Sequence, residues 1–226
     1  MTDQEIVEKV NKVLGRVADF FDSVNVVPES YKQMKQRGDD DEFFYRNLWL
    51  NDKNHQYKSN QNMLSFNAEE IEKWRIPIYV VGCSGRAKMF VKYAQEEGLN
   101  NIFIVPTVKI SDIGKKNMRG HQIIAIQMSD GHLQLINPNK RLFNQARINE
   151  KFEIGQDIDA LNRGATEFRI AAKLTPQQHD AIDSPEKLQT VYSMKKFKFD
   201  SASKQVQSGN SLQFPNAILA NQYQNG

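Results

Sequence analysis

The first clear pattern along the chain is a helical one at its N-terminus. Between residue 2 and about residue 24, apolar residues recur every three to four positions, which predicts an amphipathic helix. The stripe consists of Ile6, Val10, Val13, Leu14, Val17, Phe20 and Phe21. Thr2 and Glu5 have the spacing of a capping box at the start of this helix. Because the opposite face is not notably basic, we expect a core or docking helix rather than one that lies on a membrane.

The centre of the chain contains a second, longer helical pattern. A short capped helix is predicted for 67–74, and an apolar run over 76–81 leads into the sequence Gly-Cys-Ser-Gly at 82–85. From Cys83 onward the apolar period is helical, and Gly98 is expected to end the helix. The pattern therefore predicts a cysteine in the first turn of a helix.

Strand patterns follow this helix. Apolar runs predict strands over 102–108, 121–128 and 132–137, with Ser-Asp-Gly at 129–131 as the turn of a hairpin. A further strand is predicted at 168–172. Pro176 and Pro185 each follow a hydroxyl residue, an arrangement typical of a helix start. Helices combined with hairpin-connected strands indicate an α+β fold with an antiparallel sheet.

We divide the chain into three parts on these patterns. Residues 1–62 are expected to form a mainly helical N-terminal segment, 63–200 a core domain, and 201–226 a polar tail. The tail is rich in Ser, Gln, Asn and Gly, so it is expected to be mobile. A chain of 226 residues is long enough for one large domain with such an appendage.

Composition narrows the possible functions. The formal charge is only +3, and the alternating Lys and Phe residues of 195–199 predict an edge strand better than a nucleic-acid surface. One cysteine excludes internal disulfides and multi-cysteine zinc sites, and the scattered His55, His132 and His179 do not predict a metal site. With no signal peptide and no apolar stretch of membrane-spanning length, we expect a cytoplasmic protein, or one exported without a cleaved signal. No cofactor is predicted.

Cys83 is the first candidate for chemistry. A cysteine attacks as its thiolate, and the unpaired backbone N–H groups and dipole of a helix N-terminus lower a thiol pKa. The Cys83 amide could also stabilise an oxyanion, with Gln56, Gln61 or Tyr79 as alternatives for a second donor. A lone cysteine is equally well explained as a small buried hydrophobic residue.

His121 and Asn137 complete a candidate triad. An imidazole can accept the thiol proton, and a side-chain amide oxygen can hold the ring in the useful tautomer. A two-residue turn would make Asn137 face away from His121. A three-residue turn at 129–131, with Gly131 in the left-handed region, would pair Asn137 with Ile123 and bring both side chains to one face. Separately, His121 is also explained as a strand terminus and Asn137 as a turn residue; Asp130 and His132 form a rival acid–base pair but sit at a turn tip.

These segments resemble a known superfamily. The sequence over 81–90 is similar to the cysteine helix of transglutaminase-like, papain-like cysteine hydrolases, and 121–138 is similar to their histidine strand, glycine turn and acid–proline strand. The resemblance covers about 67–140. It departs from the family at Asn137, where Asp is usual, and in lacking aromatic residues at Gln122 and at 132–133. It implies a cysteine helix packed on an antiparallel sheet.

The resemblance also implies an activity. It points to attack of the Cys83 thiolate on an amide through a thioester, as in a protease, amidase, glutamine deamidase or transglutaminase. A protein or peptide substrate is expected, and a bacterial effector acting on host glutamine side chains fits the same chemistry. The alternative is a non-catalytic module that keeps the fold and binds a protein partner. Neither the acyl acceptor nor the oligomeric state follows from the sequence.

Overall fold

A computed structural model describes residues 1–24, 64–143, 152–193, 197–199 and 206–208. Its helices are α1 (Asp3–Val24), α4 (Ala68–Lys73), α5 (Ile78–Glu96), α6 (Pro176–Asp180) and α7 (Pro185–Ser193), with a 3-10 turn, η2 (Ile110–Asp112). Its strands are β1 (Ile102–Lys109), β2 (Gly120–Gln127), β3 (Leu133–Ile136), β4 (Asp157–Ile158), β5 (Phe168–Ile170), β6 (Phe197–Phe199) and β7 (Val206–Ser208). The first five form one antiparallel sheet in the order β3-β2-β1-β5-β4, and β6 pairs with β7. The structure confirms the predicted α+β class.

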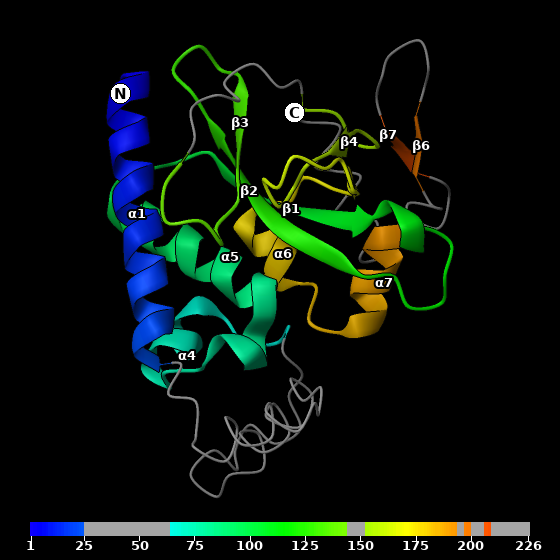
Figure 1. The fold of residues 1–226 in the computed structure, drawn as a ribbon, viewed down its shortest axis with the longest axis horizontal. Helices are drawn as coiled ribbons and strands as arrows, with labels where there is room; N and C mark the ends of the chain where they lie inside the picture. The colour runs from blue at the N-terminus through cyan, green and yellow to red at the C-terminus, as the bar shows by residue number, and fades with distance from the viewer. Residues whose placement is uncertain (25–63, 144–151, 194–196, 200–205, 209–226) are drawn as a thin grey trace, which may run out of the picture.

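The N-terminal helix is part of the main core. Thr2 and Glu5 form the expected reciprocal cap, with the Glu5 amide donating to Thr2 Oγ1 and the Thr2 amide to Glu5 Oε2. The predicted apolar stripe is buried apart from Phe20, which is partly exposed. It packs with α5 in one cluster, as Figure 1 shows for the two neighbouring helices. The prediction of a core helix is confirmed, and the core spans both sides of the boundary that we drew at residue 62.

Helices cover one face of the sheet. Ile104, Ile124 and Ile136 pack into the cluster that contains α1 and α5. On the same face, Val108 packs with a second cluster that includes α7. Figure 1 shows α5, α6 and α7 along one side of β1 and β2. Side chains alternate between the two faces of a strand, so the intervening residues of β1, β2 and β3, such as Ile123, point to the opposite face. There they form a third cluster with residues of β4 and β5. A residue's position in β2 therefore decides whether it meets the helices or the opposite layer.

Two features differ from the sequence prediction. Val206–Ser208, within the segment predicted to be a polar tail, forms a strand that pairs with β6. Strand β4 and η2 were not predicted because two or three residues are too short for a detectable hydrophobic period. Gln56, Gln61 and His55 lie outside the described residues.

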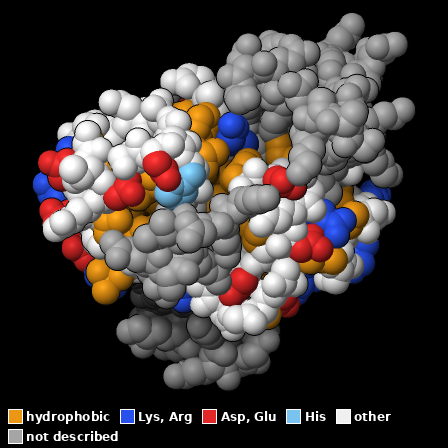
Figure 2. Space-filling view, turned by 90° about the horizontal axis from the view of Figure 1, so that it is seen from above, with side chains coloured by type: hydrophobic (Ala, Val, Ile, Leu, Met, Phe, Trp, Pro, Cys, Tyr) orange, Lys and Arg blue, Asp and Glu red, His pale blue; other side chains and the backbone are white. Residues whose placement is uncertain are grey.

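One face of the described surface carries side chains of several kinds. On the face shown in Figure 2, acidic and basic side chains occur in small separate groups, with apolar side chains between them. In the part of the chain that the structure describes, no helix has the length and apolar character needed to cross a membrane.

Candidate functional site

Cys83 lies at the start of the long continuous part of α5. Gly82 has φ 59° and ψ −155°, a conformation that is essentially restricted to glycine, and it separates the turn at 78–81 from the helix that follows. Because the helix proper restarts here, the amides of Cys83 and Ser84 have no preceding helical carbonyl to bind. Both amides act on the thiol and lower its pKa. The helix-start position predicted for Cys83 is therefore present. The residue as a whole is half-buried, whereas its sulfur is buried.

The hairpin formed by β2 and β3 has a three-residue turn, which is the turn length that the predicted triad requires. Met128 and His132 close the turn through the Met128 amide and the His132 carbonyl (2.9 Å), and Gly131 has φ 90°. Ile124 pairs with Ile136, so Asn137 falls opposite Ile123. This is the register that brings Asn137 to the same face as His121.

The imidazole of His121 binds the Asn137 side chain. The distance between His121 Nε2 and Asn137 Oδ1 is 3.0 Å, and both residues are buried. Asn137 Oδ1 also accepts the Asn139 amide at 3.1 Å, which identifies it as the oxygen of the side-chain amide. An oxygen accepts, so Nε2 carries the proton, and Nδ1 is the ring nitrogen with a free lone pair. The Thr107 hydroxyl donates to the His121 carbonyl at 2.8 Å and fixes the strand at this point.

The backbone amide of Gln122 in β2 acts on the Cys83 thiol at a point where β2 no longer has β3 beside it. Along β2 the Gln127 amide points to β1 and the Met128 amide to the returning strand, so alternation directs the Gln122 amide to the side of β3. β3 has already ended there, and Pro138 occupies the position opposite Gln122. The Gln122 amide is instead directed at the Cys83 sulfur and lowers the pKa of the thiol.

The sulfur and the ring lie on different sides of this edge. Helix α5 packs on the face of Ile124, whereas His121 belongs to the opposite face, where its ring lies 6.4 Å from that of Phe168 between centroids. The route from Cys83 to His121 therefore runs around the edge of β2, past the Gln122 amide. Among the described residues, the thiol and the imidazole are not hydrogen-bonded to each other. Unliganded enzymes often have catalytic hydrogen bonds that are long or poorly aligned.

The electrostatics of the site differ from the expectation at one point. We expected a lowered thiol pKa, but burial raises the pKa of Cys83, and the three amides and the Arg86 charge only partly oppose this effect. Burial also lowers the pKa of His121, an effect that the Asn137 hydrogen bond opposes and the charges of Arg86 and Arg163 reinforce. Both shifts favour the neutral thiol and the neutral imidazole at rest. The sequence could not reveal this balance because it depends on tertiary burial.

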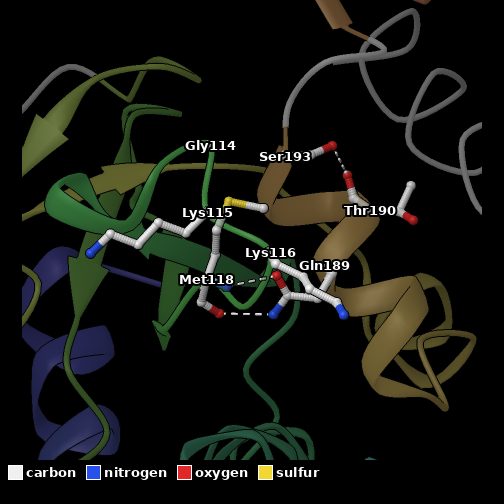
Figure 3. A pocket seen from close by; sticks show the side chains of 7 residues that line it. All are labelled: Gly114, Lys115, Lys116, Met118, Gln189, Thr190 and Ser193. Atoms are coloured by element: carbon white, nitrogen blue, oxygen red, sulfur yellow. Dashed lines mark hydrogen bonds between the residues drawn. The ribbon is translucent and has the colours of Figure 1, made fainter.

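Other candidates are not brought into this site. His132 binds Asp130 at the exposed hairpin turn, as the turn-tip interpretation predicts. His179 is buried and binds the Gln122 side chain. Within the described residues, no group of three His, Cys, Asp or Glu side chains could hold a metal ion. A separate cavity of about 260 Å³ lies between the loop at 114–118 and α7, where Gln189 binds both backbone groups of Met118 (Figure 3). The triad residues do not line it.

Three residues that act on the thiol or on the imidazole were not identified from the sequence: Gln122, Arg86 and Arg163. Gln122 had been noted only because it is not aromatic. The proline after the returning strand was the available indication that an amide of β2 would lose its partner. Arg86 follows Cys83 by one helical turn, and this spacing could have indicated a charge beside the sulfur. Nothing local in the sequence links Arg163 to His121.

Comparisons with protein-family models, with curated proteins and with solved structures gave no match to this chain. The resemblance to transglutaminase-like proteins therefore remains a prediction from the sequence motifs.

Proposed function

We propose that this chain is a cysteine-nucleophile hydrolase or acyltransferase that acts on an amide, with a transglutaminase-like, papain-like core. The observation that carries the proposal is the hydrogen bond of 3.0 Å between His121 Nε2 and Asn137 Oδ1. This bond leaves Nδ1 as the basic nitrogen, on the strand whose Gln122 amide lowers the pKa of the Cys83 thiol. A nucleophile at a helix start, a base and an orienting group are the parts that such chemistry needs.

The proposed acylation begins with proton transfer from Cys83 to His121 Nδ1. The thiolate attacks the carbonyl carbon, a C–S bond forms, and the carbonyl electrons move to oxygen. The Cys83 amide is a candidate donor for that oxyanion. When the C–N bond breaks, His121 returns the proton to the leaving amine and a thioester remains.

Deacylation follows the same path in reverse. Water or an amine attacks the thioester while His121 takes its proton, and the C–S bond breaks. The proton then passes to the sulfur, which restores Cys83. Throughout, Asn137 holds the Nε2–H and keeps Nδ1 available. Unlike a carboxylate, its amide does not offset the charge of the imidazolium.

Alkylation of Cys83 tests the proposal directly, because the chain has one cysteine. We expect iodoacetamide to modify wild-type Cys83 rapidly at pH 7, and the rate to fall at least about tenfold in His121→Ala. The control is His132→Ala, which removes a histidine from the turn of the same hairpin and should leave the rate unchanged. A slow rate that is equal in all three proteins would refute the enzymatic proposal. Mass changes on candidate proteins then distinguish deamidation, proteolysis and transamidation.

One observation favours a second candidate, a non-catalytic binding module. Burial raises the pKa of the Cys83 thiol, and the described residues include no hydrogen bond from the sulfur to the imidazole. A thiol of this kind is typically inert. The alkylation experiment separates the two candidates, since a module that only binds partners has no need for a reactive Cys83.

A further inference from the structure

Arg86 is a half-buried cation on the same helix as the candidate nucleophile. It follows Cys83 by one turn of α5, and side chains three residues apart on a helix are neighbours. Helical side chains also lean toward the N-terminus of their helix, which is the direction of Cys83. The Arg86 charge acts on both the Cys83 thiol and the His121 ring. Its position thus brings a guanidinium within electrostatic range of both reactive groups.

Within the described part of the chain, no carboxylate forms an ion pair with the guanidinium of Arg86. Its carbon atom lies 5.4 Å from the centre of the Phe21 ring, and its Nε is buried with no hydrogen-bond partner among the described residues. The Asp22 carboxylate acts on Arg86 through space, but it is bound by Arg141. Burial of a cation without a paired anion is costly, and such sites accept an anion readily.

A second positive charge, that of Arg163, acts on the His121 ring. Arg163 lies in the turn after β4, where its amide binds Asp159. Two positive charges, those of Arg86 and Arg163, therefore act on the His121 ring, and the Arg86 charge also acts on the Cys83 sulfur. The formal charge of the whole chain is only +3.

We propose that Arg86 is an anion subsite beside Cys83, and that the amide substrate carries a carboxylate close to its scissile carbonyl. A guanidinium presents a planar fork of N–H donors that matches a carboxylate in a bidentate manner. The stacking on Phe21 limits the orientations of this fork. The inference assumes the role of Cys83 proposed above and adds the chemical class of the substrate.

Two alkylating reagents of similar size test the subsite without a known substrate. Iodoacetate carries a carboxylate and iodoacetamide is its neutral analogue, and both report on Cys83 alone. We expect the ratio of the iodoacetate rate to the iodoacetamide rate to exceed that of a free cysteine peptide. In Arg86→Gln this ratio should fall about tenfold, the size expected for a charge-assisted hydrogen bond. Arg86→Lys, which keeps the charge, should retain part of the preference.

The matched control is Arg16→Gln. Arg16 also stacks on an aromatic ring, that of Tyr93 at 4.1 Å, but it is paired with Glu96 and Glu97 at the other end of α5. The ratio of iodoacetate to iodoacetamide rates in Arg16→Gln should equal that of the wild type. Circular dichroism checks that each variant is folded. The wild-type protein also tests the proposal without any variant, because its ratio of iodoacetate to iodoacetamide rates can be compared directly with that of the free peptide.

The outcomes separate the two proposals. A reactive Cys83 whose ratio matches the free peptide, or is unchanged in Arg86→Gln, would overturn the subsite and leave the nucleophile in place. A slow Cys83 that still prefers iodoacetate, with the preference lost in Arg86→Gln, would support the subsite and refute the enzyme.

Discussion

The buried His179 should make the protein sensitive to mild acid. Its Nε2 binds Gln122 Oε1, its Nδ1 has no hydrogen-bond partner among the described residues, and only 1% of the residue is exposed. Burial, reinforced by the nearby charge of Lys88, lowers the pKa of His179 well below the ordinary value of 6.5. Between these two pKa values the unfolded chain binds a proton that the folded chain does not. Stability is therefore lost as the pH falls below about 6.5.

The size of this loss follows from proton linkage. One histidine that protonates only on unfolding contributes a slope of about 1.4 kcal/mol per pH unit, or about 2 kcal/mol between pH 6.5 and pH 5. The variant His179→Gln keeps an N–H donor for Gln122 but cannot titrate. Urea denaturation at pH 7.5 and pH 5 should show a loss of unfolding free energy that is about 2 kcal/mol larger in the wild type than in the variant.

The control for this prediction is Thr190→Ala, which changes a residue of α7 that has no titratable group. Its loss between the two pH values should match that of the wild type. If His179→Gln and the wild type lose the same free energy, then His179 titrates normally in the folded protein, and the reasoning from its burial is refuted.

Three further predictions concern packing. In Gly120→Ala the new Cβ would lie 2.2 Å from the Thr107 carbonyl oxygen and 2.4 Å from the Tyr192 ring. We therefore expect urea denaturation to show a free energy of unfolding that is lower by about 1–3 kcal/mol. A smaller decrease would mean that β2 shifts easily to make room for the methyl group. Phe21→Ala removes a fully buried ring from the contact of α1 with α5 and should lower the unfolding free energy by about 3–5 kcal/mol; an unchanged value would show that α1 does not stabilise the core. Lys88→Met leaves two backbone carbonyls without their buried donor, at 2.8 and 2.9 Å in the wild type, and should cost about 2–4 kcal/mol. Hydrogen exchange checks this prediction: the backbone amides around residues 64–66 should exchange faster in Lys88→Met than in the wild type.

Local chemistry explains why much of the fold was predictable. The caps at Thr2, Asn67 and Thr175 each fix a helix start through neighbouring residues, and all three form reciprocal hydrogen bonds in the structure. The hairpin register followed from a glycine that can adopt the left-handed conformation three residues after Met128. Such signals are visible in sequence because they involve contacts within a few residues.

The remaining features depend on contacts between distant segments. The raised pKa of Cys83 arises from the burial of the sulfur, and the amide that opposes it belongs to Gln122 on another element. The influence of Arg163 on His121 likewise crosses from the turn after β4 to β2. Strand β7 pairs with β6 although its surroundings in sequence are polar. A hydrophobic period carries no information about such distant partners.

The three-residue hairpin turn restricts which mutations the site can accept during evolution. Side chains alternate along a strand, so Asn137 stays on the face of His121 only while the number of residues between the two strands keeps its parity. Substitutions at Ser129 or Asp130 leave this alignment intact, whereas inserting or deleting a single residue there would turn the amide away from the imidazole. In homologous chains that share the triad, the turn should vary in composition while its length changes only by even steps or is compensated by a bulge.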